Sequence, residues 1–565
     1  MTAWFITTLR QNAELAIFLA LAIGYLVGPL KLAGFSLGNV TACLLAGVLV
    51  GQLDVAVPGP IKAFFFLLFL FAVGYRVGPQ FFAGLKRDGI AQVVFAVVAA
   101  VLMLGAVVAF ATAVHFNVGE AAGLLAGSLT QSAAIGTATD ALSRLNLAPA
   151  VMKTLQDQIA VGYAVAYVMS TFTGVLLCTR LVPLLFRFDL SEECRKLEAQ
   201  LGLKPELPPG VFGAYALNAV RAVRIESNGI AGKTVGEVER EFEAGGHRVF
   251  VAAIRRGGAI LTATPTDVIS TGDVIALAGP TEVVISESAG REVHDPALLD
   301  IPLAQLDVVV TNPDVIGHTV EEVMMSRARG VVLKKIVRES VEAPLLPLTV
   351  IDRGDTLTIA GFANAVEAAA KVVGYAMRPS PSADVIFISL AIIIGGVIGT
   401  LSVVVGGVPI GLGTSCGALV AGLIGGYLRG RSPTFGNISP GAQWVFDSFA
   451  LCVFVAIVGI AAGPSFGAGL KSAGLPLIAG GVVIPLVSLL IAAVFGKYVL
   501  RLNNVILCGA LAGADTSSAS FGAMQDIAKS NLFTLGYTIT YAVGNVLLTI
   551  WGAVIVAIFA SKTTV

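Results

Sequence analysis

The uneven distribution of charge is the feature of this sequence that most limits its fold. The chain has 565 residues with 36 basic and 36 acidic side chains, and 45 of these 72 lie between Phe188 and Arg378. The other 374 residues hold only 27 charges. Their charge-free runs, such as 89–119 and 530–561, exceed the roughly 20 helical residues needed to cross a bilayer. We therefore expect a membrane protein with a soluble segment in its middle.

Composition excludes several other classes of protein. Only 13% of the residues are charged, about half the share found in soluble globular domains. Equal numbers of basic and acidic side chains remove the positive patch that a nucleic-acid-binding protein needs. The six cysteines include no CxxC pair, so no disulfide framework, metal site or cofactor is expected. The motifs GxSxG, GxxxxGK[ST] and HExxH are missing, and no enzyme activity is expected.

The two membrane parts are copies of each other. Ala126–Gly136 aligns with Ala512–Gly522 at a constant offset of 386, and both stretches are rich in Gly, Ser and Thr. A second block, Gly74–Lys86, aligns with Gly459–Lys471 at an offset of 385. Internal repeats of this kind determine the architecture of many transporters.

The orientation of the copies depends on the two Gly/Ser/Thr-rich segments, Glu120–Asp140 and Asn503–Asp526. If they cross the membrane fully, each half has six spans and the copies are parallel. If each is a re-entrant hairpin, each half has five spans and the copies are inverted. Inversion places most Lys and Arg of the short loops on the cytoplasmic side, as the positive-inside rule requires, and we prefer it.

The soluble insert contains a repeat of its own. Gly232–Val238 resembles Gly317–Val323, and each is followed by an apolar strand, a Gly-Asp turn and a second strand. The modules, of about 75 residues each, resemble the RCK-C (TrkA-C) regulatory subdomains that accompany potassium channels and uptake systems. No GxGxxG follows a strand in the insert, which argues against regulation by NAD.

The predicted fold is a polytopic α-helical membrane protein. It has two inverted repeats of five transmembrane helices plus one re-entrant hairpin each, and a central α+β cytoplasmic insert of two RCK-C-like modules. The expected divisions are membrane repeat 1, a linker, insert modules 1 and 2, and membrane repeat 2, at residues 1–187, 188–213, 214–295, 296–378 and 379–565.

The tips of the two hairpins are the predicted substrate site. Backbone that leaves the helix at membrane depth is tolerated where it lines a cavity, and helix starts attract carboxylates. The alternative is that these small residues only let membrane helices pack closely. The candidate binding residues are Ser128, Thr130, Gln131 and Ser132 in the first tip and Asp515, Thr516, Ser517 and Ser518 in the second.

Two charges lack a counterpart in the other repeat. Arg76 aligns with Ala461, and a buried arginine suits bidentate binding of a carboxylate, although an arginine that snorkels to the interface is the alternative. Asp515 aligns with Leu129, and it could receive a substrate ammonium, bind a coupling cation or cap a helix. Asp447, at the head of a span, is expected to be interfacial.

Taken together, these motifs resemble the aspartate:alanine exchanger family of bacterial membrane antiporters. The match rests on Gly74-Tyr-Arg-Val-Gly-Pro79, the Ala-Gly-(Ser/Ala)-x-Thr-x-Ser tips, the Gly-Tyr-Ala-Val-Ala-Tyr block and the Gly-Asp turns. The resemblance implies electrogenic exchange of aspartate inward for alanine outward, by a homodimer in the bacterial inner membrane. It also implies that the helix carrying Arg76 lines the substrate path, together with Gly74, Tyr75 and Pro79.

Three other functions stay open at this point. Some members of the family handle plain dicarboxylates such as succinate, so a dicarboxylate exporter or exchanger is the first alternative. An RCK-regulated cation transporter or channel is a distant one, because no TVGYG-like filter is present. A membrane receptor that uses the insert as a sensor is the third. In the preferred reading the partners are the small-molecule substrates, membrane lipid and a possible small-molecule regulator of the insert.

Overall fold

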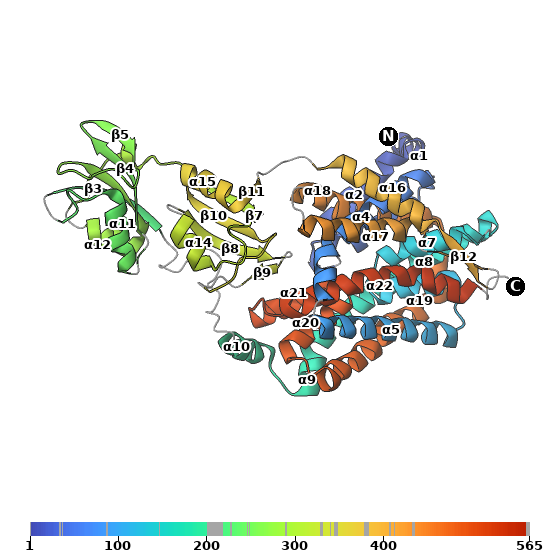
Figure 1. Cartoon of the computed structure of the whole chain (residues 1–565). Coiled ribbons are helices and arrows are strands. Elements are labelled where there is room, and N and C mark those ends of the chain that lie inside the picture. The colour runs from blue at the N-terminus through green and yellow to red at the C-terminus, as the bar shows by residue number, and fades with distance from the viewer. Residues whose placement is uncertain are drawn as a thin grey trace. The chain divides into compact units, whose positions relative to one another are not determined.

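The computed structural model divides the chain into two units, which are described separately. The membrane unit comprises Met1–Lys204 and Ser380–Val565, and the insert comprises Pro205–Pro379 (Figure 1). The structure describes residues 2–32, 35–36, 38–85, 89–145, 147–200, 218–226, 229–245, 247, 249–288, 291–327, 331–338, 341–343, 348–377, 383–405, 408–411, 413–431 and 436–560.

The first half of the membrane unit is helical apart from one short hairpin, β1 (Lys31–Leu32) with β2 (Phe35–Ser36). A π-helical turn at Leu177–Leu181 joins its last two membrane helices. Helix α10 follows them within the expected linker. The helices are α1 (Thr2–Gln11), α2 (Ala13–Val27), α3 (Asn39–Gly51), α4 (Gly59–Gly84), α5 (Ile90–Ala113), α6 (Val118–Ser128), α7 (Ala133–Ser143), α8 (Pro149–Leu176), α9 (Val182–Phe186) and α10 (Leu190–Gln200).

The second half has the same character, with one hairpin, β12 (Ser402–Val405) with β13 (Val408–Gly411). Two π-helical turns, Val445–Phe449 and Phe495–Val499, flank its longest helix. The helices are α16 (Val385–Gly399), α17 (Gly413–Arg431), α18 (Pro440–Trp444), α19 (Ala450–Val494), α20 (Asn504–Ala514), α21 (Ser518–Ala528) and α22 (Thr534–Ala560).

Among the described residues, five helical stretches are long and apolar enough to cross a membrane, or six if the bent pair α1–α2 counts as one span. The prediction of a multi-pass helical membrane protein with a strand-containing insert is therefore confirmed. Fewer separate spans are found than the ten expected, and two of the missing ones correspond to α3 and α16, which have only 13 and 15 residues.

The expected spans 448–470 and 472–496 form one continuous helical stretch, Gly441–Val499. At 1.5 Å per residue its 59 residues would extend about 88 Å, roughly three times the hydrocarbon thickness. Pro464, Pro476 and Pro485 lie inside it, and each removes a helical hydrogen bond without ending the helix. Both of its ends pack within the unit.

Helix packing repeats along with the sequence. A Cβ added at Gly74 of α4 would meet the Leu419 carbonyl of α17, and one added at Gly459 of α19 would meet the Leu44 carbonyl of α3. The two glycines are counterparts in the repeat. Their missing side chains let the backbones of two helices touch, as small residues do in membrane bundles. The sequence repeat thus reproduces the same close helix contact in both halves.

The insert contains two sheets of related topology. The first has the strand order β3-β6-β4-β5, and the second has β11-β7-β10-β8-β9, in which β11 adds one edge strand. All pairs are antiparallel. The elements are β3 (Asn218–Arg224), α11 (Val235–Ala244), β4 (Phe250–Arg256), β5 (Ala259–Thr262), β6 (Val274–Pro280), α12 (Thr281–Ser288), α13 (Pro296–Leu299), β7 (Leu303–Val310), α14 (Val320–Arg327), β8 (Val331–Arg338), β9 (Val341–Ala343), β10 (Thr356–Phe362), α15 (Ala363–Val373) and β11 (Gly374–Met377).

Each sheet carries the same ion pair at its Gly-Asp turn. Arg256 binds Asp273 through two nitrogens, at 3.0 and 2.6 Å, and Arg338 binds Asp355 at 2.8 and 2.7 Å. Both aspartates are buried. The hydrogen bonds from Arg256 hold the pKa of the Asp273 carboxyl below its usual value. The turn residue therefore fixes the strand that follows it in each module.

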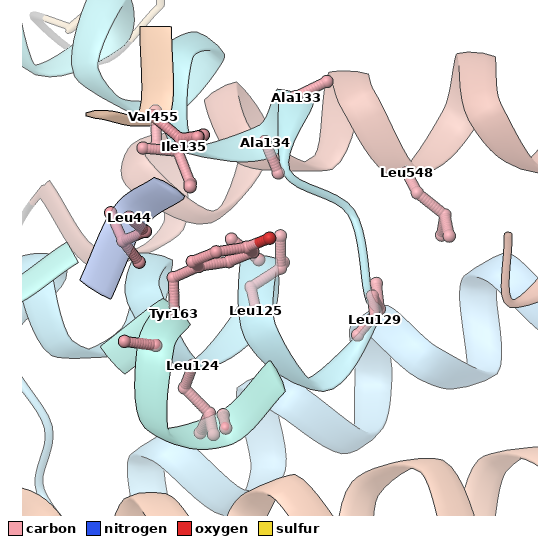
Figure 2. Close-up of a cluster of buried hydrophobic side chains, with 14 of the residues drawn as sticks. Leu44, Leu124, Leu125, Leu129, Ala133, Ala134, Ile135, Tyr163, Val455 and Leu548 are labelled. Atoms are coloured by element: carbon pink, nitrogen blue, oxygen red, sulfur yellow. The ribbon is translucent and has the colours of Figure 1, made fainter. Parts of the chain in front are cut away.

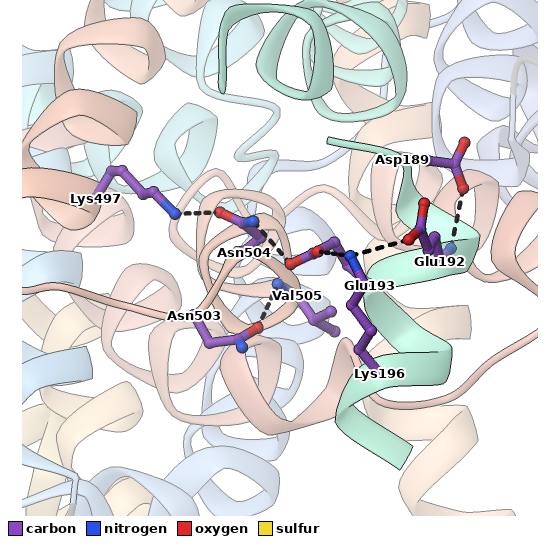
Figure 3. Close-up of polar contacts among 8 residues, drawn as sticks. All are labelled: Asp189, Glu192, Glu193, Lys196, Lys497, Asn503, Asn504 and Val505. Carbon is purple, nitrogen blue, oxygen red and sulfur yellow. Dashed lines mark hydrogen bonds and ion pairs between the residues drawn. The ribbon is translucent and has the colours of Figure 1, made fainter. Parts of the chain in front are cut away.

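The expected linker contains helix α10, which is tied to the membrane unit (Figure 3). Asn504, at the start of α20, donates a hydrogen bond of 2.8 Å to Glu193 and accepts one from Lys497. Asn503 caps the same helix end by accepting from the Val505 amide. Residues 190–200 are therefore part of the membrane unit's packing rather than a free tether.

Candidate functional site

Two helices of the membrane unit are broken in the same way. α6 and α7 are separated by four residues, and α20 and α21 by three; each of the four helices has 11 residues and extends about 16 Å. In both breaks a threonine has a positive φ of 50°, Thr130 in the first and Thr516 in the second. The next residue in each, Gln131 or Ser517, donates its amide to a carbonyl five residues earlier at 2.9 Å.

The structure brings the two breaks together. The Thr130 hydroxyl donates to the backbone carbonyl of Asp515 at 2.7 Å. The Ser132 hydroxyl lies 2.7 Å from the Tyr163 hydroxyl, and Gln131 Nε2 lies 3.4 Å from Asn545 Oδ1. Figure 2 shows the first break, where the chain leaves the helix between Leu129 and Ala133 and passes the Tyr163 ring. Buried apolar side chains surround it, so this non-helical backbone is enclosed by protein.

A pocket of about 300 Å³ lies at this junction, a volume at the small end of the range for ligand sites. Six of the candidate residues line it, including three from the first break and two from the second. Polar groups from α8, α22 and the π-helical turn Val445–Phe449 complete it. The lining residues are Arg76, Thr130, Gln131, Ser132, Thr516 and Ser518, with Tyr25, Asn39, Val40, Phe69, Val73, Tyr167, Trp444, Asp447, Ser448, Leu451, Cys452, Tyr541 and Asn545.

An ion pair occupies one wall of the pocket. Arg76 Nη1 lies 2.7 Å from Asp447 Oδ2, and Arg76 Nη2 lies 3.2 Å from the Tyr541 hydroxyl. The Ser448 hydroxyl donates to the other carboxylate oxygen at 2.7 Å. The Arg76 side chain is 44% exposed while that of Asp447 is 6% exposed, so the guanidinium keeps donors free to face the pocket. The wall therefore presents both signs of charge side by side.

Asp447, which was expected at the head of a span, is buried and paired with Arg76 in the pocket wall. It lies in the π-helical turn Val445–Phe449, and such turns occur often at functional sites. The sequence did contain a signal, an acidic residue in an apolar span. Its partner, however, lies 371 residues earlier, and no local pattern joins the two.

The other predicted residues lie outside the pocket lining. Ser128 and Asp515 are buried, and the Ser517 hydroxyl caps α21 by accepting from the Ser520 amide. Gly74 faces α17, and Tyr75 donates to the Gly436 carbonyl at 2.8 Å. Pro79 lies inside α4, one turn beyond these two residues.

Sequence reasoning about the site missed the polar side chains of α8 and α22. Tyr167 belongs to the block Gly-Tyr-Ala-Val-Ala-Tyr, and Tyr541 occupies the matching position in the second copy. Both line the pocket, and their recurrence was the available signal. Asn545 follows Tyr541 by one helical turn, and a lone amide in an apolar span was a second signal.

Comparisons with known proteins agree with a role in transport. A family model described as "Predicted Permease Membrane Region" matches residues 16–183 and 387–557, and a TrkA-C domain model matches residues 220–286. An uncharacterized transporter of Shewanella oneidensis is 41% identical, covering 98% of this chain and 99% of the relative. One of Bradyrhizobium diazoefficiens is 41% identical over 91% of this chain and 100% of its own length. No solved structure matches.

Proposed function

We propose that this chain, which belongs to the aspartate:alanine exchanger family of predicted permeases, is a secondary antiporter that takes up aspartate and releases alanine. Family membership follows from the permease model, which covers both membrane halves, and it confirms the resemblance drawn from the sequence. The relatives are named as transporters, and their names give no substrate. The substrate assignment therefore depends on the chemistry of the pocket.

The observation that carries the proposal is the Arg76–Asp447 pair beside the pocket. An amino acid presents a carboxylate and an ammonium on one carbon, and the pair offers a cation and an anion 2.7 Å apart. Arginine binds a carboxylate through two parallel N–H donors. The substrate ammonium would bind Asp447, which lines the pocket, rather than Asp515, which does not. A zwitterion can therefore replace each half of the ion pair with a matching charge.

The second carboxylate of aspartate requires additional donors. Ser132 and Ser518 line the pocket at the starts of α7 and α21, where helix amides and the positive end of the dipole face an anion. The Thr516 hydroxyl has no hydrogen-bond partner among the described residues and lies in the same wall. Alanine needs none of these groups and fits the same pocket. Aspartate carries one more negative charge, so each exchange moves charge across the membrane.

Transport would use alternating access between two inverted repeats, with α6–α7 and α20–α21 as re-entrant hairpins. Three features support this arrangement: the repeated glycine contacts between helices, the matching helix breaks, and the basic residues of the short loops. In this scheme the insert is cytoplasmic and biases the transport equilibrium, and the protein works as a homodimer in the bacterial inner membrane.

Counterflow in liposomes tests the proposal. Purified protein is reconstituted, the vesicles are loaded with alanine, and labelled aspartate is supplied outside. We expect uptake that requires internal alanine and creates a membrane potential. Uptake that ignores the internal load contradicts exchange. Succinate lacks the ammonium and should compete poorly; competition equal to that of aspartate would favour the dicarboxylate alternative instead.

A further inference from the structure

The carboxylate of Asp515 is the polar group in the described residues that most needs a partner. Asp515 is 1% exposed, and neither of its side-chain oxygens has a hydrogen bond. No ion pair in the described part of the chain includes it. Burial of an unpaired carboxylate is costly, so proteins normally supply a counter-charge. Asp515 also does not line the substrate pocket, and it caps no helix, since both oxygens are unbonded.

The surroundings of Asp515 favour a positive charge. α6 and α20 both end here, and their ends touch through the 2.7 Å bond from Thr130 to the Asp515 carbonyl. Helix C-termini carry partial negative charge, and in transporters the ends of half-helices hold coupling cations. The hydroxyl oxygens of Ser128 and Thr516 at these ends are also buried without a partner. Two negative helix ends, a carboxylate and unpaired hydroxyls thus gather at one place.

A glycine on the neighbouring helix leaves room beside the carboxylate. A Cβ added at Gly174 of α8 would lie 3.3 Å from Asp515 Oδ2 and 3.1 Å from the Ser520 hydroxyl. Those two oxygens therefore face a common space that no side chain of residue 174 fills. The titratable groups nearest to Asp515 on α8 and the turn after it are Tyr167 and Cys178, and neither supplies a positive charge.

We propose that Asp515 is the carboxylate ligand of a site for a monovalent cation, sodium, at the junction of the two helix breaks. Backbone and hydroxyl oxygens of Ser128, Thr516 and Ser520 are the further ligands, since hard cations prefer oxygen. One buried carboxylate is neutralised by one positive charge, whereas a divalent ion would leave a net charge behind. Thr516 also lines the substrate pocket, so cation and substrate binding are thermodynamically linked. Sodium bound at this site would be the coupling ion of the exchange, which the proposed function leaves unnamed.

Direct cation binding to the full chain in detergent tests this proposal without any transport measurement. Thermal unfolding is followed in sodium chloride and in choline chloride at equal ionic strength. We expect sodium to raise the unfolding midpoint of the wild type by about 2 °C or more, because a ligand that binds only the folded state stabilises it. Asp515→Asn, which keeps the side-chain shape, should lose the shift. Asp526→Asn removes an exposed carboxylate of the same hairpin and should keep it.

Two further variants keep the test decisive if Asp515→Asn folds poorly. Ser520→Ala removes one oxygen, and Gly174→Ala fills the space beside it. Each variant should need about tenfold more sodium to reach the same rise in the unfolding midpoint, which corresponds to 1.4 kcal/mol. A wild type that does not respond to sodium overturns the proposal, as does an equal response in Asp515→Asn. A midpoint that responds to pH alone also overturns it, because a proton would then neutralise Asp515. A failed exchange assay with an intact sodium shift would instead contradict the proposed substrates.

Discussion

The break between α6 and α7 and the break between α20 and α21 share a left-handed threonine and differ in their side chains. The threonine of each has a φ of 50°, but the residue before it is Leu129 in the first and Asp515 in the second. Thr130 bonds to the opposite break, whereas the hydroxyl of Thr516 has no partner among the described residues. The repeat thus fixes the conformation of the breaks, and the proposed chemistry depends on positions where the copies differ.

The insert gives the opposite case, because its two modules repeat the charged pair as well as the strand order. A pair that is present in both copies serves the fold of each copy. A charge that is present in only one copy serves the proposed binding functions of the membrane unit, which has one site for each. This distinction can be tested with substitutions that remove or add a charge or a hydroxyl in one copy of a repeat.

The largest effect is expected when the first break is given the charge of the second. Leu129 is fully buried, and Leu129→Asp would place an unpaired carboxylate there at a cost of several kcal/mol, about 5. We expect loss of monodisperse protein in size-exclusion chromatography. Leu129→Met, which keeps an apolar side chain of similar volume, is the control and should cost less than about 1.5 kcal/mol. A stable Leu129→Asp variant would mean that both breaks tolerate a charge.

Removing Asp447 should have the next largest effect, because the substrate ammonium then loses its proposed partner. We expect Asp447→Asn to weaken alanine and aspartate binding by about 100-fold, or roughly 3 kcal/mol. Equilibrium binding to the purified protein measures this. Ser448→Ala, which removes only a hydrogen bond to the same carboxylate, should cost tenfold or less. Equal losses in the two variants would assign Asp447 to packing rather than to the substrate.

Arg76→Lys keeps the positive charge and loses the paired donors of the guanidinium. We expect the affinity for aspartate to fall about tenfold, or roughly 1.4 kcal/mol, with the ability to exchange retained. The competition of alanine against labelled aspartate gives both affinities in one assay. Unchanged affinity would show that Arg76 anchors α4 through Asp447 and does not touch the substrate.

The two threonines form a matched pair with a smaller expected difference. Thr130→Val removes the hydrogen bond to the Asp515 carbonyl and should destabilise the protein by about 1 kcal/mol. Thr516→Val removes a hydroxyl without a protein partner, and in choline chloride it should leave stability nearly unchanged. Unfolding midpoints of the two variants, measured side by side, decide this. Equal destabilisation would contradict the asymmetry between the breaks.

The smallest effect concerns the insert at low pH. Because Arg256 lowers the pKa of folded Asp273, the pair's contribution is fully present above the unfolded value of about 3.9 and is lost as pH falls through the lower folded value. We expect the amides of β4 and β6 to be less protected, relative to their intrinsic exchange rates, on acidification below pH 4, measured by hydrogen exchange in the full chain. Arg256→Met should already show that lower protection at pH 6. Protection that is the same at both pH values would contradict the role of the pair.

The sequence was sufficient to predict what depends on local spacing. Charge-free runs predict the membrane parts, and the Gly/Ser/Thr repeat predicts the residues of the breaks, of which Thr130, Gln131 and Thr516 do line one pocket. It was not sufficient for contacts between distant helices. The partner of Arg76 is 371 residues away, and the direction in which Asp515 points within its break is set by packing against α8. A sequence repeat shows where a residue lies along the chain. The direction of its side chain depends on packing against other helices, which the repeat does not reveal.

Helix α10 connects the end of the first membrane half to the start of α20 in the second. It directly precedes the segment that leads to the insert, and it holds the first turn of α20 through Glu193 and Asn504. α20 is a rod of 11 residues, and Asp515 stands at its far tip about 16 Å away. A displacement of α10 would therefore be carried along α20 to the end where Asp515 lies.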